Sequence, residues 1–118
     1  MEWLGEHGAD GWASCPITQN GCVRILSHPA YPNAHSVAEI VKRLRAATAH
    51  DSHEFWPDDL SVLDEALIDP TRVHGPRQLT DVYLLALAVK HGGRLATFDA
   101  TIATGAVTGA KPRHLVGL

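Results

Sequence analysis

The sequence predicts an α/β fold around a buried parallel sheet, and two adjoining segments in its last third carry that prediction. The segment Val82–Val89 is apolar on almost every side, which is typical of a helix buried between other layers. The segment Leu95–Phe98 is a short apolar run of the kind found in buried parallel strands. A Gly-Gly pair between them supplies a helix stop. We therefore expect a helix from Thr80, as the N-cap, to His91, followed by a strand from Arg94 to Phe98.

The expected lengths of this helix and strand bring their two acidic ends together. A helix of about 12 residues descends about 18 Å, and about five strand residues climb back about 17 Å. Asp81 and Asp99 should therefore lie at one edge of the sheet, where open α/β sheets bind ligands. Two carboxylates there repel each other unless a cation lies between them or one is protonated, and hard oxygen ligands favour Mg²⁺ or Mn²⁺. Alternatively, Asp81 only complements the helix dipole, and Asp99 only ends a strand and opens a turn.

Composition and charge restrict the class of protein. With 118 residues, of which 45% are hydrophobic and 19% charged, the chain can form one domain with a real core, which we expect to span residues 1–118. The net charge of −3 gives no polycationic signal, so any contact with nucleic acid must depend on local basic residues and a metal ion. Two cysteines are too few for a disulfide framework, and neither a secretory signal nor a membrane-spanning apolar run is visible. We therefore expect a cytoplasmic protein with no membrane contact.

The remaining segments fit short strands that alternate with helices. Pro16 suits the first turn of a helix, and Ser36 with Glu39 forms a capping box. The elements expected before the central helix are a helix end at Glu2–His7, a strand at Gly11–Cys15, a helix from Ile17 to Ser27, a helix from Ser36 to Ala49, a strand at Glu54–Trp56, and a helix from Leu60 to Leu67 with Val62, Leu63, Ala66 and Leu67 turned inward. After the central pair, Pro112–Val116 should form a loop and an edge strand.

Several polar side chains near the acidic edge are further candidates. Gln19 falls in the first turn of the expected Ile17–Ser27 helix, although capping and first-turn polarity explain such a residue equally well. Arg77 comes just before the central helix and could contact phosphate, although a surface arginine is the simpler interpretation. His50 and His53 are too loosely spaced to predict a zinc site in a chain with eight histidines.

Two motifs resemble the PIN-domain family and, more narrowly, the VapC-type ribonuclease toxins of bacterial toxin–antitoxin pairs. The motifs are T-D-x-Y-L-x-A-L-A at Thr80–Ala88 and L-x-T-F-D at Leu95–Asp99. Supporting stretches are Cys15–Pro29 and Arg77–Asp81, so the resemblance covers nearly the whole chain. It implies a three-layer α/β/α sandwich with a parallel sheet, and metal-dependent cleavage of RNA by acidic residues that hold Mg²⁺. It also implies an antitoxin partner and a homodimer.

The resemblance further implies roles for individual residues. Asp81 and Asp99 match the metal-binding acids of the family, and Thr97 matches a polar residue beside the site. Gln19 falls where the family commonly has glutamate, in T-E-N-G. Its amide oxygen could still accept a hydrogen bond from a metal-bound water.

Two departures from the family pattern leave the activity of the chain open. Gln19 cannot carry a negative charge, and the first central strand of the family, which ends in an aspartate, has no counterpart, so we expect an N-terminally truncated chain. The leading hypothesis is an endoribonuclease toxin in which Asp81 and Asp99 hold Mg²⁺ while Arg77 and Arg24 offset phosphate charge. The second hypothesis is a degenerate, non-catalytic PIN-like module that binds an antitoxin. A doubly wound phosphate-binding or response-regulator-like domain ranks last, because no glycine-rich P-loop is present.

Overall fold

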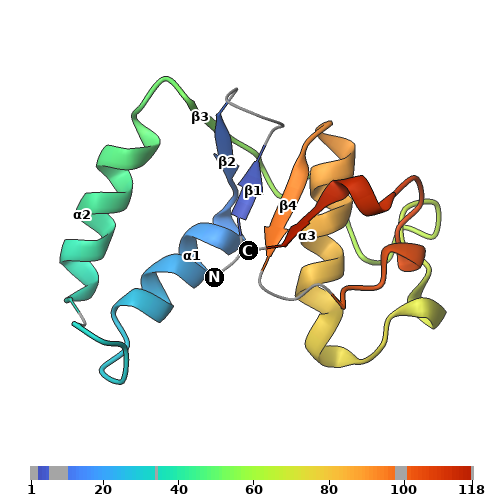
Figure 1. Ribbon diagram of the computed structural model, residues 1–118, viewed down its shortest axis with the longest axis horizontal. Coiled ribbons are helices and arrows are strands. Elements are labelled where there is room, and N and C mark those ends of the chain that lie inside the picture. Colours follow the sequence, from blue (N-terminus) through green and yellow to red (C-terminus); the bar gives the residue numbers. More distant parts are fainter. Residues whose placement is uncertain (1–2, 6–10, 34, 98–100, 118) are drawn as a thin grey trace.

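The computed structural model shows helices on both sides of a mixed sheet (Figure 1). It describes residues 3–5, 11–33, 35–97 and 101–117. Within these ranges the strands form one five-stranded sheet in the order β3-β2-β1-β4-β5. The strands are β1 (Trp3–Gly5), β2 (Trp12–Ser14), β3 (His53–Phe55), β4 (Arg94–Thr97) and β5 (Leu115–Gly117). The α-helices are α1 (Pro16–Leu26), α2 (Val37–Thr48) and α3 (Leu79–Lys90).

The two outer pairs of strands are parallel, as the sequence predicts. β2 pairs with β3 so that Ser14 lies opposite Phe55, and β4 pairs in the same way with the edge strand β5. The strand between the two pairs, β1, runs antiparallel to both neighbours, with Leu4 opposite Ala13 on one side and Leu95 on the other. The α/β prediction is therefore confirmed, and the sheet is parallel in its outer pairs and antiparallel at its centre.

The strand β1 corrects the helix end predicted at Glu2–His7, which is wrong for Trp3–Gly5. So short a helix is unstable alone. As a strand, the same backbone pairs on both sides and satisfies the facing polar groups of β2 and β4. β1 also occupies the centre of the sheet, the position that the family resemblance gives to its first strand.

The helix α3 forms the buried centre of the fold. Every residue from Val82 to Ala88 is buried, and Leu85 and Leu87 have no exposed surface. These side chains pack with Trp56 and Leu95 in one core cluster. α1 and α2 lie beside each other on one side of the molecule, and α3 lies with the C-terminal segment on the other (Figure 1). The predicted all-round apolar helix is thereby confirmed.

Most predicted boundaries are correct to within one or two residues. Ser36 caps α2 as expected, because its hydroxyl accepts a hydrogen bond from the Glu39 N–H at 3.1 Å. Thr80 is not the N-cap of α3: a 3₁₀ helix at Pro76–Gln78 runs directly into the α-helix, which makes Gln78 the cap and places Thr80 in the first turn. β4 is described as far as Thr97. None of the helices within the described ranges is long and apolar enough to cross a membrane.

The helix predicted from Leu60 to Leu67 is wrong. This segment consists of turns, and two of its polar side chains explain why. The Ser61 hydroxyl accepts from the Leu63 N–H at 3.1 Å, and the Asp64 carboxylate accepts from the Ala66 N–H at 2.9 Å. These local bonds give the backbone an alternative to the helical ladder. Val62 and Leu67 still pack against the core, whereas Leu63 and Ala66, both predicted to turn inward, are exposed.

Candidate functional site

A candidate site is a cleft of about 280 Å³ between α1 and α3, called here the Asp81 cleft. Its walls are formed by Ile17, Thr18, Gly21, Cys22, Arg24 and Ile25 from α1 and by Thr80, Asp81 and Leu84 from α3. Asp81 lies in the first turn of α3, where the positive end of the helix dipole favours a carboxylate. Arg24, in the last turn of α1, supplies a cation to the same cleft. A carboxylate and a guanidinium that line one cleft suit a phosphate accompanied by a metal ion.

The structure does not bring Gln19 into this cleft. Gln19 instead lines a groove between α1 and α2, together with Asn20 and Val23 of its own helix. The reason is helical rotation: at about 100° per residue, position 19 lies on the opposite side of α1 from Ile17 and Gly21. Gln19 is therefore in the first turn of α1, as predicted, but on the face of the helix that looks away from the Asp81 cleft.

Three other predicted residues have distinct positions. Asp99 lies outside the described residues. Thr97 ends β4 and is 1% exposed, so it offers almost no surface to an RNA strand in this arrangement. Arg77 is exposed in the 3₁₀ helix just before α3, as the sequence suggested.

A hydrogen-bonded chain that sequence reasoning missed holds the Gln19 amide. The Gln19 Nε2 donates to Ser14 Oγ at 3.0 Å, and Ser14 Oγ lies 2.7 Å from His53 Nε2. Ser14 is only 5% exposed, and the His53 ring packs against Trp12 with ring centroids 4.4 Å apart. Ser14 and His53 come from the paired strands β2 and β3, so the only sequence signal was a serine at the end of a predicted strand. We call this group the Ser14 network.

The donor chemistry of the Asp81 cleft suits a hard cation, although the described residues give it few ligands. The Asp81 carboxylate and the Thr80 hydroxyl both line the cleft and are oxygen ligands. Among the described residues no group of three His, Cys, Asp or Glu side chains could hold a metal ion. His50, part of the H-D-S-H stretch, contacts Ser52 instead, with its Nδ1 2.9 Å from the hydroxyl oxygen.

The two cysteines are poorly suited to act as nucleophiles. Burial raises the pKa of the Cys15 thiol above its ordinary value, against the opposing effect of hydrogen bonds with Thr18. Burial also raises the pKa of the Cys22 thiol. Because the thiolate is the reactive form, both groups are held in the less reactive state.

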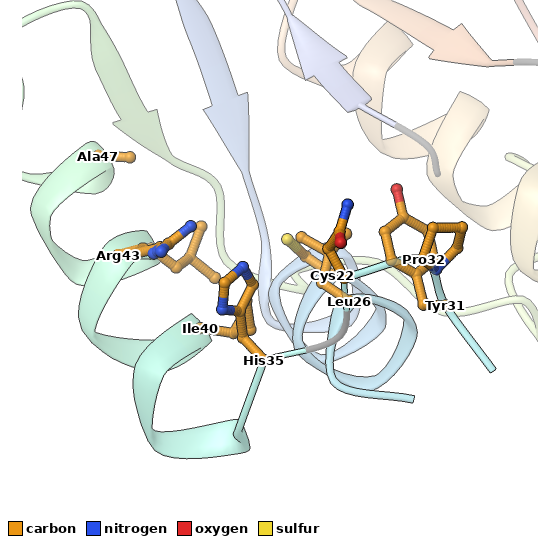
Figure 2. A pocket seen from close by; sticks show the side chains of 10 residues that line it. Cys22, Leu26, Tyr31, Pro32, His35, Ile40, Arg43 and Ala47 are labelled. Atoms are coloured by element: carbon orange, nitrogen blue, oxygen red, sulfur yellow. The ribbon is translucent and has the colours of Figure 1, made fainter. Parts of the chain in front are cut away.

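A second hollow lies between α1 and α2 and is more apolar (Figure 2). It measures about 360 Å³, and its lining includes Leu26 from α1 and Ile40 from α2. Its basic side chains both approach Glu39: Arg43 donates to the carboxylate at 2.8 Å, and His35 Nδ1 lies 3.9 Å from the same oxygen. Glu39 balances the charge of Arg43, which makes this hollow the weaker candidate for an anionic substrate.

Comparison with known proteins identifies relatives over nearly the whole chain. Ribonuclease VapC44 of Mycobacterium tuberculosis is 52% identical over 116 residues, which are 98% of this chain and 82% of the relative. Ribonuclease VapC39 of the same organism is 39% identical over 110 residues, covering 92% of this chain and 79% of the relative. Ribonuclease VapC38 is 40% identical over 104 residues, covering 87% and 72%. No protein-family model and no solved structure matches the chain. At this identity and coverage, the chain belongs to the VapC-type family of PIN-domain ribonuclease toxins.

Proposed function

We propose that the chain is a metal-dependent endoribonuclease that hydrolyses RNA phosphodiester bonds as the toxin of a type II toxin–antitoxin module. Family membership supports the reaction class. The Asp81 cleft is the observation that supports placing the reaction at a particular site. There Asp81 and Arg24 line one cavity together with Thr80. Mg²⁺ is the proposed metal and Mn²⁺ the alternative, because both prefer oxygen ligands.

Each residue of the proposed mechanism has one task. Asp81, with Asp99 as the second proposed ligand, binds the cation at the amino end of α3. Arg24 and, from the preceding 3₁₀ helix, Arg77 offset the negative charge of the phosphate. A bound divalent cation supplies Lewis-acid chemistry and lowers the pKa of the attacking water. Gln19, which the family pattern proposed as a catalytic residue through its amide oxygen, lies on the other side of α1 and has no task in this cleft.

The proposed partners follow from the family. They are an RNA substrate and a cognate antitoxin protein, with a homodimer as the proposed assembly and the cytoplasm as the proposed location. The overall charge of −3 means that RNA must be held by local groups such as Arg24.

The test is the substitution Asp81→Asn, which keeps the side-chain size and removes the charge. We expect Mn²⁺ binding, measured by calorimetry, to weaken, and RNA cleavage to fall by about 10²-fold or more, as when a transition-state charge loses its partner. Asp51→Asn is the matched control, because it removes a carboxylate from an exposed turn before β3. Equal cleavage in EDTA, or full activity of Asp81→Asn, would show that the mechanism is wrong.

One observation favours a second candidate function, a non-catalytic PIN-like module that binds an antitoxin. Gln19, which falls where the family commonly has glutamate, carries no negative charge and lines another groove. A folded chain that binds an antitoxin peptide but neither Mn²⁺ nor RNA would support this alternative.

A further inference from the structure

A glycine lies in the wall of the Asp81 cleft, in the middle of a helix. Gly21 belongs to α1 and lines both this cleft and the adjoining hollow that contains Asn20 and Thr80. After proline, glycine is the least favourable residue for a helix interior, because it gives up the most backbone freedom on folding. Its presence there calls for a reason.

The packing of the chain does not supply that reason. Gly21 does not have a positive φ, and a Cβ built on it meets no atom of the described residues within 4 Å. Gly11 shows the contrast: its φ is +121°, and a Cβ there would collide with the Ser52 carbonyl oxygen. Gly11 is therefore required by backbone and packing, whereas position 21 has room for a side chain.

A side chain at position 21 would instead project into the cleft. Arg24 lies three residues further along α1, on the same face of the helix, and Asp81 lies on the opposite wall. The bare backbone at Gly21 thus leaves open the path between the proposed phosphate-binding cation and the proposed metal ligand.

We propose that Gly21 determines substrate access: it allows the sugar–phosphate backbone of a single RNA strand to lie against α1 between Arg24 and Asp81. The inference rests on the proposed ribonuclease function and adds the part of the substrate that the cleft receives. The cleft of about 280 Å³ and the adjoining hollow of about 500 Å³ share Gly21, Arg24 and Thr80, so an extended single strand can follow α1 past Gly21 with its backbone in contact along its length.

The test is a size series at this position, Gly21→Ala and Gly21→Leu, in the full chain. Both new residues are better helix formers, and the Cβ that they share meets no described atom within 4 Å, so the thermal midpoint should stay the same or rise. Binding of a fluorescein-labelled single-stranded RNA, followed by anisotropy, should weaken with side-chain size, by about tenfold or more for leucine. Cleavage should show the same order in KM, with a smaller change in kcat. Ala46→Leu, on an exposed position of α2, is the control for adding the same side chain elsewhere.

The outcomes separate this inference from the proposed function. Wild-type RNA affinity in Gly21→Leu would overturn the role of Gly21 and leave the proposed function standing. A lower thermal midpoint in both variants would assign Gly21 to packing and also overturn it. Equal affinity of the wild-type chain for duplex and single-stranded RNA would overturn the assignment to a single strand. A folded wild-type chain that binds no RNA would overturn both.

Discussion

Replacing Ser14 by alanine tests whether the Ser14 network stabilises the fold. The substitution removes a hydroxyl that accepts from Gln19 Nε2 at 3.0 Å and lies 2.7 Å from His53 Nε2. The Ser14 carbonyl still accepts from the Trp56 N–H at 2.9 Å, so the backbone pairing at the end of β2 is kept. The change is therefore confined to two side-chain hydrogen bonds.

The expected loss follows from these two bonds and from the burial of the groups. Each neutral hydrogen bond contributes about 0.5–1.5 kcal/mol net, which gives about 1–3 kcal/mol for the pair. Gln19 and His53 are only half-buried and regain water contact once the hydroxyl is gone, which lowers the penalty for leaving them unpaired. We expect Ser14→Ala to lower the free energy of unfolding by about 1–2 kcal/mol, or the thermal midpoint by about 4–8 °C.

Urea unfolding at pH 7 measures this loss directly through the midpoint concentration and the slope. Ser52→Ala is the matched control, because Ser52 Oγ also contacts a histidine, His50 Nδ1 at 2.9 Å, but at an exposed position. We expect the free energy of unfolding of the control to fall by less than about 0.5 kcal/mol, as is usual for surface substitutions. If Ser14→Ala lost no more than Ser52→Ala, the Ser14 network would not be a stabilising unit and the reasoning would be refuted.

Two further predictions concern charges. Gln19→Glu adds a carboxylate that cannot donate to Ser14, so the Ser14 hydroxyl must donate to it and His53 must become the donor to Ser14. Because Gln19 lines a groove on the other side of α1 from Asp81, Mn²⁺ titration should show unchanged affinity, and tighter binding would return Gln19 to the proposed metal site. Asp59 contacts both His91, at 3.2 Å, and Lys90, at 3.5 Å. Burial works against ionisation of Asp59, but the hydrogen bond from His91 and the nearby cations outweigh it and hold its pKa below the ordinary value. Because the ionised form of Asp59 is favoured in the folded state, Asp59→Asn should lower the free energy of unfolding at pH 7. Solvent screening limits this loss to about 0.5–1 kcal/mol, and the loss should disappear as the pH falls through the lowered pKa. Urea unfolding at several pH values checks this against the neighbouring Asp58→Asn, and a difference that grew on acidification would contradict it.

The parts of the fold that were predictable are those in which local pattern and burial agree. The apolar run of α3 and the short strand β4 meet in the core. Their sequences are apolar because they are buried, so the hydrophobic pattern was enough to predict both. The helix prediction for Leu60–Leu67 was wrong because the side chains of Ser61 and Asp64 accept hydrogen bonds from nearby backbone N–H groups. An apolar pattern does not reveal such bonds. The helix prediction at Glu2–His7 was wrong because the strand pairing of β1 depends on a partner strand, β4, that lies far along the chain.

The candidate site was predictable only in part, for related reasons. Asp81 lies in the first turn of α3, as the predicted helix required, whereas the predicted approach of Asp99 involves a residue outside the described ranges. The separation of Gln19 from Asp81 depends on the rotation of α1, which arithmetic on element lengths does not include. The Ser14 network joins residues 39 positions apart in the chain, so only the pairing of β2 with β3 brings them together.

The unequal burial of α1 and α3 has a thermodynamic consequence for the Asp81 cleft. One wall belongs to α3, which is fixed in the core, whereas α1 has no fully buried residue. A ligand that touches both walls must order the less firmly held one, so part of its interaction free energy offsets that ordering. A macromolecule that holds α1 or α2 in place beforehand removes this cost and tightens ligand binding, and by linkage the ligand strengthens the hold of that macromolecule equally. The affinity of the cleft is thus a property of the whole α1–α2 layer and not of its lining residues alone.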